Sequence, residues 1–203
     1  MVDARRIAFL GIGHPLRRDD AAGVEVCDRL RPALGSRTDV LVVNGGSAPE
    51  NVVGALRRFA PDQVIVLDAA RMGQAPGTVR RIDPSDPHAW GASTHTLPMP
   101  VFCRYLEETL GCTVTLIGIE PADTSFGEGL TPEVQAAVEG ASADALATLV
   151  APRQTGALDG GWLSSASSLA AAESAQPPRP LRQAEEAAAW DSALPARDQE
   201  RMP

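Results

Sequence analysis

The chain has 203 residues, a formal net charge of −8 at pH 7 and 44% hydrophobic residues. This length suffices for one domain with a substantial core and an additional tail. The negative charge argues against nucleic acid as a main partner, because binding to phosphates requires basic side chains. There is no apolar run of about 18 residues, so we expect no membrane span. Since the N-terminal residues lack the apolar stretch of a secretory signal, we expect a cytoplasmic protein.

Strand and helix patterns alternate along residues 1–150. Short apolar runs that end in Gly, Asn or an acid predict strands, and apolar residues at helical spacing predict helices. In chain order, the sequence predicts a strand at 7–10, a helix at 24–30, a strand at 40–43, a helix at 49–59, a strand at 64–67, an edge strand at 78–82, a helix at 100–110, a strand at 113–119 and a helix at 132–149. This alternation predicts an α/β fold, a three-layer α/β/α domain whose mostly parallel central sheet has about five strands.

The helix at 100–110 has the clearest amphipathic pattern. We expect its buried side to carry Phe102, Tyr105, Leu106 and Leu110.

Residues 151–203 differ in composition, being rich in Ala, Ser, Pro, Gly and Gln. They offer too little clustered apolar surface to offset the entropy of ordering the chain, so we expect a disordered tail after a 1–150 domain. The alternative is a short helix over 184–194 that carries Trp190 and binds a partner.

Three cysteines are scattered along the chain without a Cys-x-x-Cys pairing, namely Cys27, Cys103 and Cys112. All lie in apolar patterns, so we expect buried, reduced thiols, as in a cytoplasmic protein. Burial disfavours a thiolate, which leaves a cysteine nucleophile with little support. A serine nucleophile has as little, since Ser47 lacks the Gly-x-Ser-x-Gly turn of α/β-hydrolases.

Acidic and imidazole side chains follow the predicted strands. A Gly-x-Gly turn after the first strand leads to Asp19 and Asp20, Asp68 ends an apolar strand, and His95 precedes the helix at 100–110. Open α/β sheets bind ligands at the carboxyl edge of their strands, where we expect these groups to meet. Two acids and an imidazole predict a site for a divalent transition metal, assembled from separate loops.

Each of these residues also has a structural interpretation. Asp19 and Asp20 are typical helix N-cap residues, and Asp68 suits a turn or cap at a strand end. His95 can be a structural histidine with satisfied hydrogen bonds. A dinucleotide site is disfavoured, because Leu16 replaces the third glycine of that fingerprint. The residues alone leave the structural and the metal-binding interpretations open.

Further polar residues lie near the same predicted edge. His14 lies in the first loop, where it can assist the site, and Glu120 ends a strand, where it can line a pocket. Glu50 is most simply an acid in the first turn of a helix.

Five motifs in fixed order resemble the hydrogenase maturation proteases, endopeptidases that finish the large subunit of [NiFe] hydrogenases. They are GIGHPLRRDDAAG at 11–23, GGSAPEN at 45–51, VLDAARMG at 66–73, STHTLP at 93–98 and GIEP at 118–121. The second and third motifs look most like the formate-hydrogenlyase branch of that family. The resemblance covers roughly residues 5–150.

The resemblance implies a phosphorylase/hydrolase-like fold and a metal site whose ligands fall, by motif position, on Asp20, Asp68 and His95. We add the hypothesis that the metal locates the peptide while Asp20 or Asp68 helps to activate water as the catalytic group. Substrate contacts are expected from the residues around these motifs: Gly46, Glu50, His14 and Glu120.

The implied substrate is the large-subunit precursor of a [NiFe] hydrogenase, already loaded with Ni²⁺. Its short C-terminal extension is cut off just beyond the final Cys-x-x-Cys motif, after a His or Arg. Other divalent ions such as Cd²⁺ or Zn²⁺ can occupy the same site, and we expect the enzyme to act as a monomer.

Two residues depart from the family pattern. His14 replaces an Asn, and can add a fourth ligand or change the metal preference. Arg18 replaces a Gly, and can contact an acidic stretch of the precursor. Two other functions remain as alternatives: a non-catalytic, nickel-dependent chaperone for hydrogenase assembly, and a metal-dependent amidase for a small substrate.

Overall fold

The computed structural model describes residues 5–83 and 98–150. The tail predicted at 151–203 and the predicted ligand His95 lie outside this part of the chain. Within it, no helix is both long and apolar enough to cross a membrane.

Five strands form one sheet in the order β2-β1-β3-β5-β4. Their bounds are Ile7–Ile12 for β1, Val40–Gly46 for β2, Gln63–Ala69 for β3, Val79–Ile82 for β4 and Thr113–Ile119 for β5. The first four strands in this order run parallel, and β4 pairs antiparallel with β5 at one edge. The mostly parallel sheet and the edge position of β4 are both as predicted.

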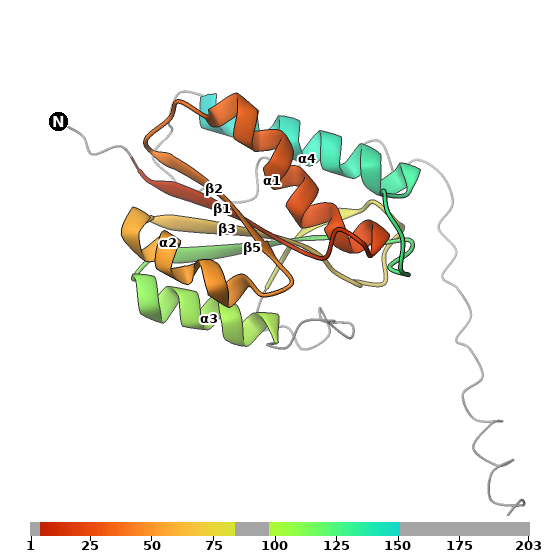
Figure 1. Ribbon diagram of the computed structural model, residues 1–203, viewed down its shortest axis with the longest axis horizontal. Coiled ribbons are helices and arrows are strands. Elements are labelled where there is room, and N and C mark those ends of the chain that lie inside the picture. Colours follow the sequence, from red (N-terminus) through yellow and green to blue (C-terminus); the bar gives the residue numbers. More distant parts are fainter. Residues whose placement is uncertain (1–4, 84–97, 151–203) are drawn as a thin grey trace, which may run out of the picture. The chain divides into compact units, whose positions relative to one another are not determined.

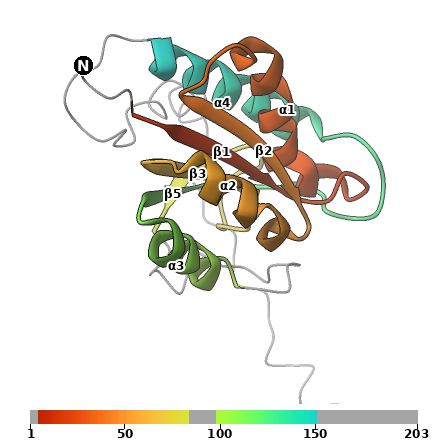
Figure 2. The same ribbon diagram turned by 60° about the vertical axis from the view of Figure 1, so that its left-hand side comes forward.

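Helices cover both faces of this sheet, as Figures 1 and 2 show. They are α1 (Ala22–Leu34), α2 (Val53–Phe59), α3 (Met99–Leu110) and α4 (Pro132–Val150), with the short 3-10 helices η1 (Arg18–Ala21) and η2 (Pro49–Val52) in front of α1 and α2. Helices α1 and α4 pack on one face, and α2 and α3 pack on the other. The α/β fold with three layers is therefore confirmed.

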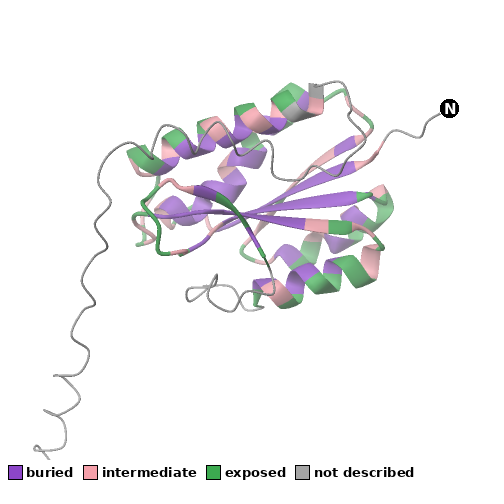
Figure 3. Ribbon diagram, turned by 180° about the vertical axis from the view of Figure 1, so that it is seen from behind, coloured by how far each residue is buried: buried purple, intermediate pink, exposed green. Residues whose placement is uncertain are grey.

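The core lies in two layers because strand side chains alternate between the faces of the sheet. Ile65 and Leu67 of β3 join the cluster under α1 and α4, whereas Val64 and Val66 join the cluster under α2 and α3. All six residues of β1 are buried, as a strand covered on both faces requires. Figure 3 shows the buried strands at the centre.

The predicted inner face of α3 is wrong at one position. Tyr105 is 43% exposed, whereas Met99, Phe102, Cys103 and Leu106 are buried. At about 100° per residue, the buried positions span the arc from Phe102 through Leu106 and Met99 to Cys103, and Tyr105 lies about 60° outside it. The small Cys103, and not the large Tyr105, therefore completes the contact with the sheet.

Two glycines allow α1 to pack directly on the strand ends. A side chain on Gly23 would collide with the Leu67 carbonyl, and one on Gly13 with the Asp20 carbonyl. Gly13 also has φ +138, a conformation that favours glycine. This close approach brings the start of α1 against the end of β3.

Candidate active site

The candidate site lies where the order of the strands in the sheet reverses. Strands β1 and β3 are neighbours, with Gly11 opposite Leu67. The connection through α1 leaves β1 over one face of the sheet, and the connection through α2 enters β3 from the other. The carboxyl ends of β1 and β3 therefore lie at the topological switch point, where open α/β sheets have their ligand-binding crevice.

Asp20 lies on the β1 side of this crevice. It belongs to η1, which packs on β3, and is only 5% exposed. Its Oδ2 accepts a hydrogen bond of 2.8 Å from the backbone N–H of His14. The N-cap positions of η1 and α1 are Arg17 and Ala21, so neither aspartate of the pair occupies a cap.

Asp68 lies on the β3 side, one residue beyond the Gly11–Leu67 pair. It is buried, with only 4% of its surface exposed. The fold thus brings Asp20 and Asp68 to the ends of neighbouring strands, as the sequence predicts. Carboxylates in this place can bind a divalent ion or accept a proton from water.

Asp19 has a different role from its neighbour, one that sequence reasoning did not assign. Its fully buried carboxylate accepts four hydrogen bonds from the segment between β5 and α4. The backbone N–H groups of Ala122 and Asp123 bond to Oδ2 at 2.9 Å, the Thr131 hydroxyl bonds to Oδ2 at 3.0 Å, and the Thr131 N–H bonds to Oδ1 at 2.7 Å. Asp19 therefore anchors this segment, whereas the Asp20 carboxylate bonds to the loop that follows β1. The two consecutive aspartates are the signal in the sequence that could have shown this, because one anchors a loop and the other belongs to the candidate site.

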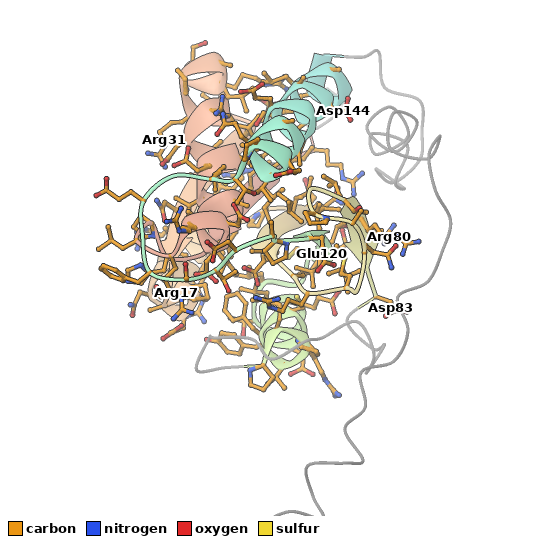
Figure 4. The ribbon with its side chains drawn as sticks, turned by 90° about the vertical axis from the view of Figure 1, so that its right-hand side faces the viewer. Arg17, Arg31, Arg80, Asp83, Glu120 and Asp144 are labelled. Atoms are coloured by element: carbon orange, nitrogen blue, oxygen red, sulfur yellow. The ribbon has the colours of Figure 1, made fainter. Side chains whose placement is uncertain are left out.

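Glu120 also anchors a loop. Its buried Oε2 accepts hydrogen bonds from the backbone N–H groups of Met72 at 2.6 Å and Gln74 at 3.0 Å. These bonds close the turn that follows β3. Figure 4 labels Glu120 among the loops at this edge of the sheet. A contact between Glu120 and substrate stays a prediction.

The end of β2 joins the same edge. The backbone N–H of Gly13 donates to the Gly46 carbonyl at 3.0 Å, and Gly46 has φ +54. Asn44 Oδ1 accepts a bond of 2.9 Å from the Gly46 N–H. Glu50 lies in the first turn of η2 with its side chain exposed, as expected of a first-turn acid. Substrate contacts by Gly46 and Glu50 stay predictions.

His14 is half-buried and oriented by its own loop. Its Nδ1 accepts a hydrogen bond of 3.1 Å from the Leu16 N–H. A neutral imidazole that accepts at Nδ1 carries its proton on Nε2. Nε2 is then a donor, which suits a substrate carbonyl better than a metal ion.

The third predicted ligand, His95, lies outside the described residues. Across 5–83 and 98–150, no three His, Cys, Asp or Glu side chains are grouped so that they could hold a metal ion. A metal site here accordingly needs a further ligand beyond Asp20 and Asp68, from His95 or from a substrate.

The cysteines provide no nucleophile. Burial raises the pKa of the Cys27 and Cys103 thiols to about 12, so neither forms a thiolate near neutral pH. Cys112 is half-buried, which corrects the expectation that all three are buried, and burial raises its pKa as well. Its place before β5, at the amino end of a strand parallel to β3, puts it at the edge of the sheet opposite Asp68.

Known proteins match both the sequence and the fold. A family model described as hydrogenase maturation protease matches residues 24–148. The hydrogenase 3 maturation protease of Escherichia coli K12 is 34% identical over 132 residues, which cover 64% of this chain and 83% of that protein.

Solved structures agree with these sequence matches. A [NiFe] hydrogenase maturation protease, HycI from Thermococcus kodakarensis KOD1, has a TM-score of 0.61 at 35% identity, covering 73% of this chain and 92% of that one. The endopeptidase HycI from Escherichia coli has a TM-score of 0.60 at 31% identity, covering 68% of this chain and 88% of that one.

The α/β fold and these matches define a peptidase, a hydrolase that acts on peptide bonds. The chain belongs to the hydrogenase maturation protease family.

Proposed function

We propose that this protein is an endopeptidase that removes the C-terminal extension of a nickel-loaded [NiFe] hydrogenase large-subunit precursor. The observation that carries the proposal is the pair of buried carboxylates, Asp20 and Asp68, in a chain of the maturation protease family. They lie at the ends of β1 and β3, between which the strand order of the sheet reverses. We further propose that it acts as a monomer in the cytoplasm.

Hydrolysis of the peptide bond needs a water molecule and a proton carrier. In the proposed reaction, the Asp20 or Asp68 carboxylate takes a proton from water as its oxygen attacks the scissile carbonyl. The same proton then passes to the leaving amine as the C–N bond breaks. The His14 Nε2–H can donate to a substrate carbonyl, which fixes the peptide in the crevice.

Nickel enters this proposal as part of the substrate. Asp20 and Asp68 supply oxygen ligands that suit a divalent ion, and His95 would supply an imidazole. Binding of the precursor nickel by these residues would restrict cleavage to subunits that are already loaded. Zn²⁺ or Cd²⁺ would occupy the same donors in the absence of nickel.

The test is cleavage of the large-subunit precursor in nickel-loaded and nickel-free form, followed by intact mass. Loss of a short C-terminal peptide from the loaded form alone would support the proposal. Binding without loss of mass would favour a nickel-dependent assembly chaperone. Hydrolysis of a small amide without any precursor would favour an amidase.

A further inference from the structure

Two loops beside the candidate site are joined along their backbones. The N–H of Gly127 donates to the Leu16 carbonyl at 2.9 Å, and the N–H of Arg18 donates to the Gly127 carbonyl at 3.0 Å. Asp19 donates its N–H to the Asp123 carbonyl at 3.1 Å. Its carboxylate accepts a hydrogen bond from the Asp123 N–H, so Asp19 holds the loop at 120–131. The loops at 14–18 and 120–131 therefore form one fixed unit next to Asp20.

This unit displays apolar side chains to solvent. Phe126 is 80% exposed and Leu16 is 39% exposed, and both belong to the few large hydrophobic side chains that are exposed in the described residues. The bond between Gly127 and Leu16 brings their positions close together. Aromatic side chains are enriched where proteins contact one another, so Phe126 can supply the apolar part of a contact with a partner protein.

Three arginines contact the loop that carries Phe126. Arg17 Nη2 donates to the Thr124 carbonyl at 3.1 Å, and Arg71 Nη2 donates to the hydroxyl of the same Thr124 at 3.0 Å. Arg18 Nε lies 3.2 Å from Asp123 Oδ2. Figure 4 shows Arg17 beside the loop that leads into α4.

The arginines keep further donors for a ligand. Each of the three contacts described above uses one nitrogen of a guanidinium group. Each guanidinium has five N–H donors in a fork that matches a carboxylate. The Asp123 carboxylate offsets part of this charge, since it pairs with Arg18 and also lies in the field of Arg71. Three arginines outnumber this one acid, so the cluster is suited to a further acidic group.

We infer that Leu16, Arg17, Arg18, Arg71 and Phe126, here named the recognition surface, bind the precursor next to its cleaved bond. Phe126 and Leu16 contact an apolar side chain of the precursor, and the arginines bind one of its carboxylates. This inference rests on the proposed function. It places the contacts beside the candidate site, because Asp20 follows Arg18 by two residues and Arg71 follows Asp68 by three. Nearby contacts of this kind would select one precursor among similar ones.

A purely structural role makes a different prediction. If the arginines only tie the loops together, their loss would lower stability and leave the affinity for precursor unchanged. If they bind the precursor, their loss would raise KM and leave kcat unchanged. The difference in KM between the variant and the unchanged protein would disappear at high salt, because salt screens the attraction between the charges.

The experiment measures KM and kcat for cleavage of the nickel-loaded precursor by four variants. Phe126→Ala and Arg71→Gln alter the recognition surface, whereas Tyr105→Ala and Arg104→Gln alter an exposed aromatic and an exposed arginine on α3. We expect Phe126→Ala to raise KM about tenfold and Arg71→Gln about threefold to tenfold, with kcat within about twofold. Thermal unfolding of each variant should match that of the unchanged protein.

The outcomes separate this inference from the proposed function. If the unchanged protein cleaves the precursor, and Phe126→Ala and Arg71→Gln cleave it with the same KM, the recognition surface is overturned and the proposed function stands. Failure of the unchanged protein to cleave would overturn both. The source of the carboxylate is found by repeating the Arg71→Gln comparison with altered precursors, either with the acids of the extension changed to amides or with its last residues removed. If the Arg71 effect survives in both precursors, the arginines bind no carboxylate there.

Discussion

The two edges of the parallel sheet bury polar groups of different kinds. At the carboxyl edge, the buried polar residues are acids: Asp19, Asp20, Asp68 and Glu120. Toward the amino edge they are neutral, since Gln63 Nε2 donates to the Thr115 hydroxyl at 3.0 Å. Charge is costly to bury, so a concentration of acids at one edge points to chemistry there, whereas the neutral pair serves packing. The acids themselves divide further, because Asp19 and Glu120 hold loops while Asp20 and Asp68 border the crevice.

The largest effect is expected from the crevice acids. Asp20→Asn and Asp68→Asn should each lower kcat for precursor cleavage by at least about 100-fold, since each removes a carboxylate that can bind a metal or carry a proton. Both variants should remain folded. Intact mass after a timed reaction measures the loss, with Asp28→Asn on the exposed side of α1 as the control. Normal cleavage by Asp68→Asn would show that the Asp68 carboxylate takes no part in the reaction.

Asp19→Asn tests whether the neighbouring acid is an anchor. An amide cannot accept all four hydrogen bonds that reach the carboxylate, and the charge that strengthens them is lost. We expect the free energy of unfolding to fall by about 2–3 kcal/mol. Urea denaturation measures this change. A variant as stable as the parent would mean that the loop before α4 is held by other contacts.

Gly23→Ala tests the packing of α1 against β3. The added methyl group meets the backbone carbonyls of Leu67 and Ile12, which cannot rotate away. We expect a loss of about 1–3 kcal/mol in stability together with reduced activity, because the start of α1 must shift near Asp20. The matched control is Gly54→Ala in α2, where the nearest atom is a flexible arginine tip at 3.7 Å. That substitution should stabilise the protein by about 0.4–1 kcal/mol.

The neutral pair at the amino edge should affect stability alone. Thr115→Val leaves the buried Gln63 amide without its acceptor, at a cost of about 1 kcal/mol. Replacing both partners, as Gln63→Leu with Thr115→Val, should restore part of that loss. Neither change should alter kcat. A fall in kcat would show that the two edges are coupled and would weaken the contrast between them.

Thiol alkylation should show the smallest effect. With a pKa of about 12, roughly 10⁻⁴ of the Cys27 and Cys103 thiols is ionised at pH 8. Native protein treated with iodoacetamide should therefore be modified first at the half-buried Cys112 and keep its activity. The denatured protein should react at all three positions. Rapid loss of activity with label on Cys27 or Cys103 would contradict the absence of a cysteine nucleophile.

The local elements were predictable from the sequence because their periodicity is local. The strand predicted at 113–119 matches β5, and the helix predicted at 132–149 matches α4 to within one residue. The placement of Asp20 and Asp68 at the carboxyl edge of the sheet was predictable too, since parallel neighbouring strands end at one edge. Tyr105 shows the limit, because the inner face of a helix depends on what it packs against.

The sequence by itself determined the alternating elements, the mostly parallel sheet with one edge strand, the acids at its carboxyl edge and the family. Only the tertiary structure assigned Asp19 to the loop before α4, Glu120 to the turn after β3, and Phe126 to the loop beside Leu16. Each of these contacts joins residues more than about forty positions apart, and hydrogen bonds depend on where both partners lie. Spacing along the chain specifies which residues share a face, but the choice between an anchor and a reacting group depends on what the folded chain places opposite.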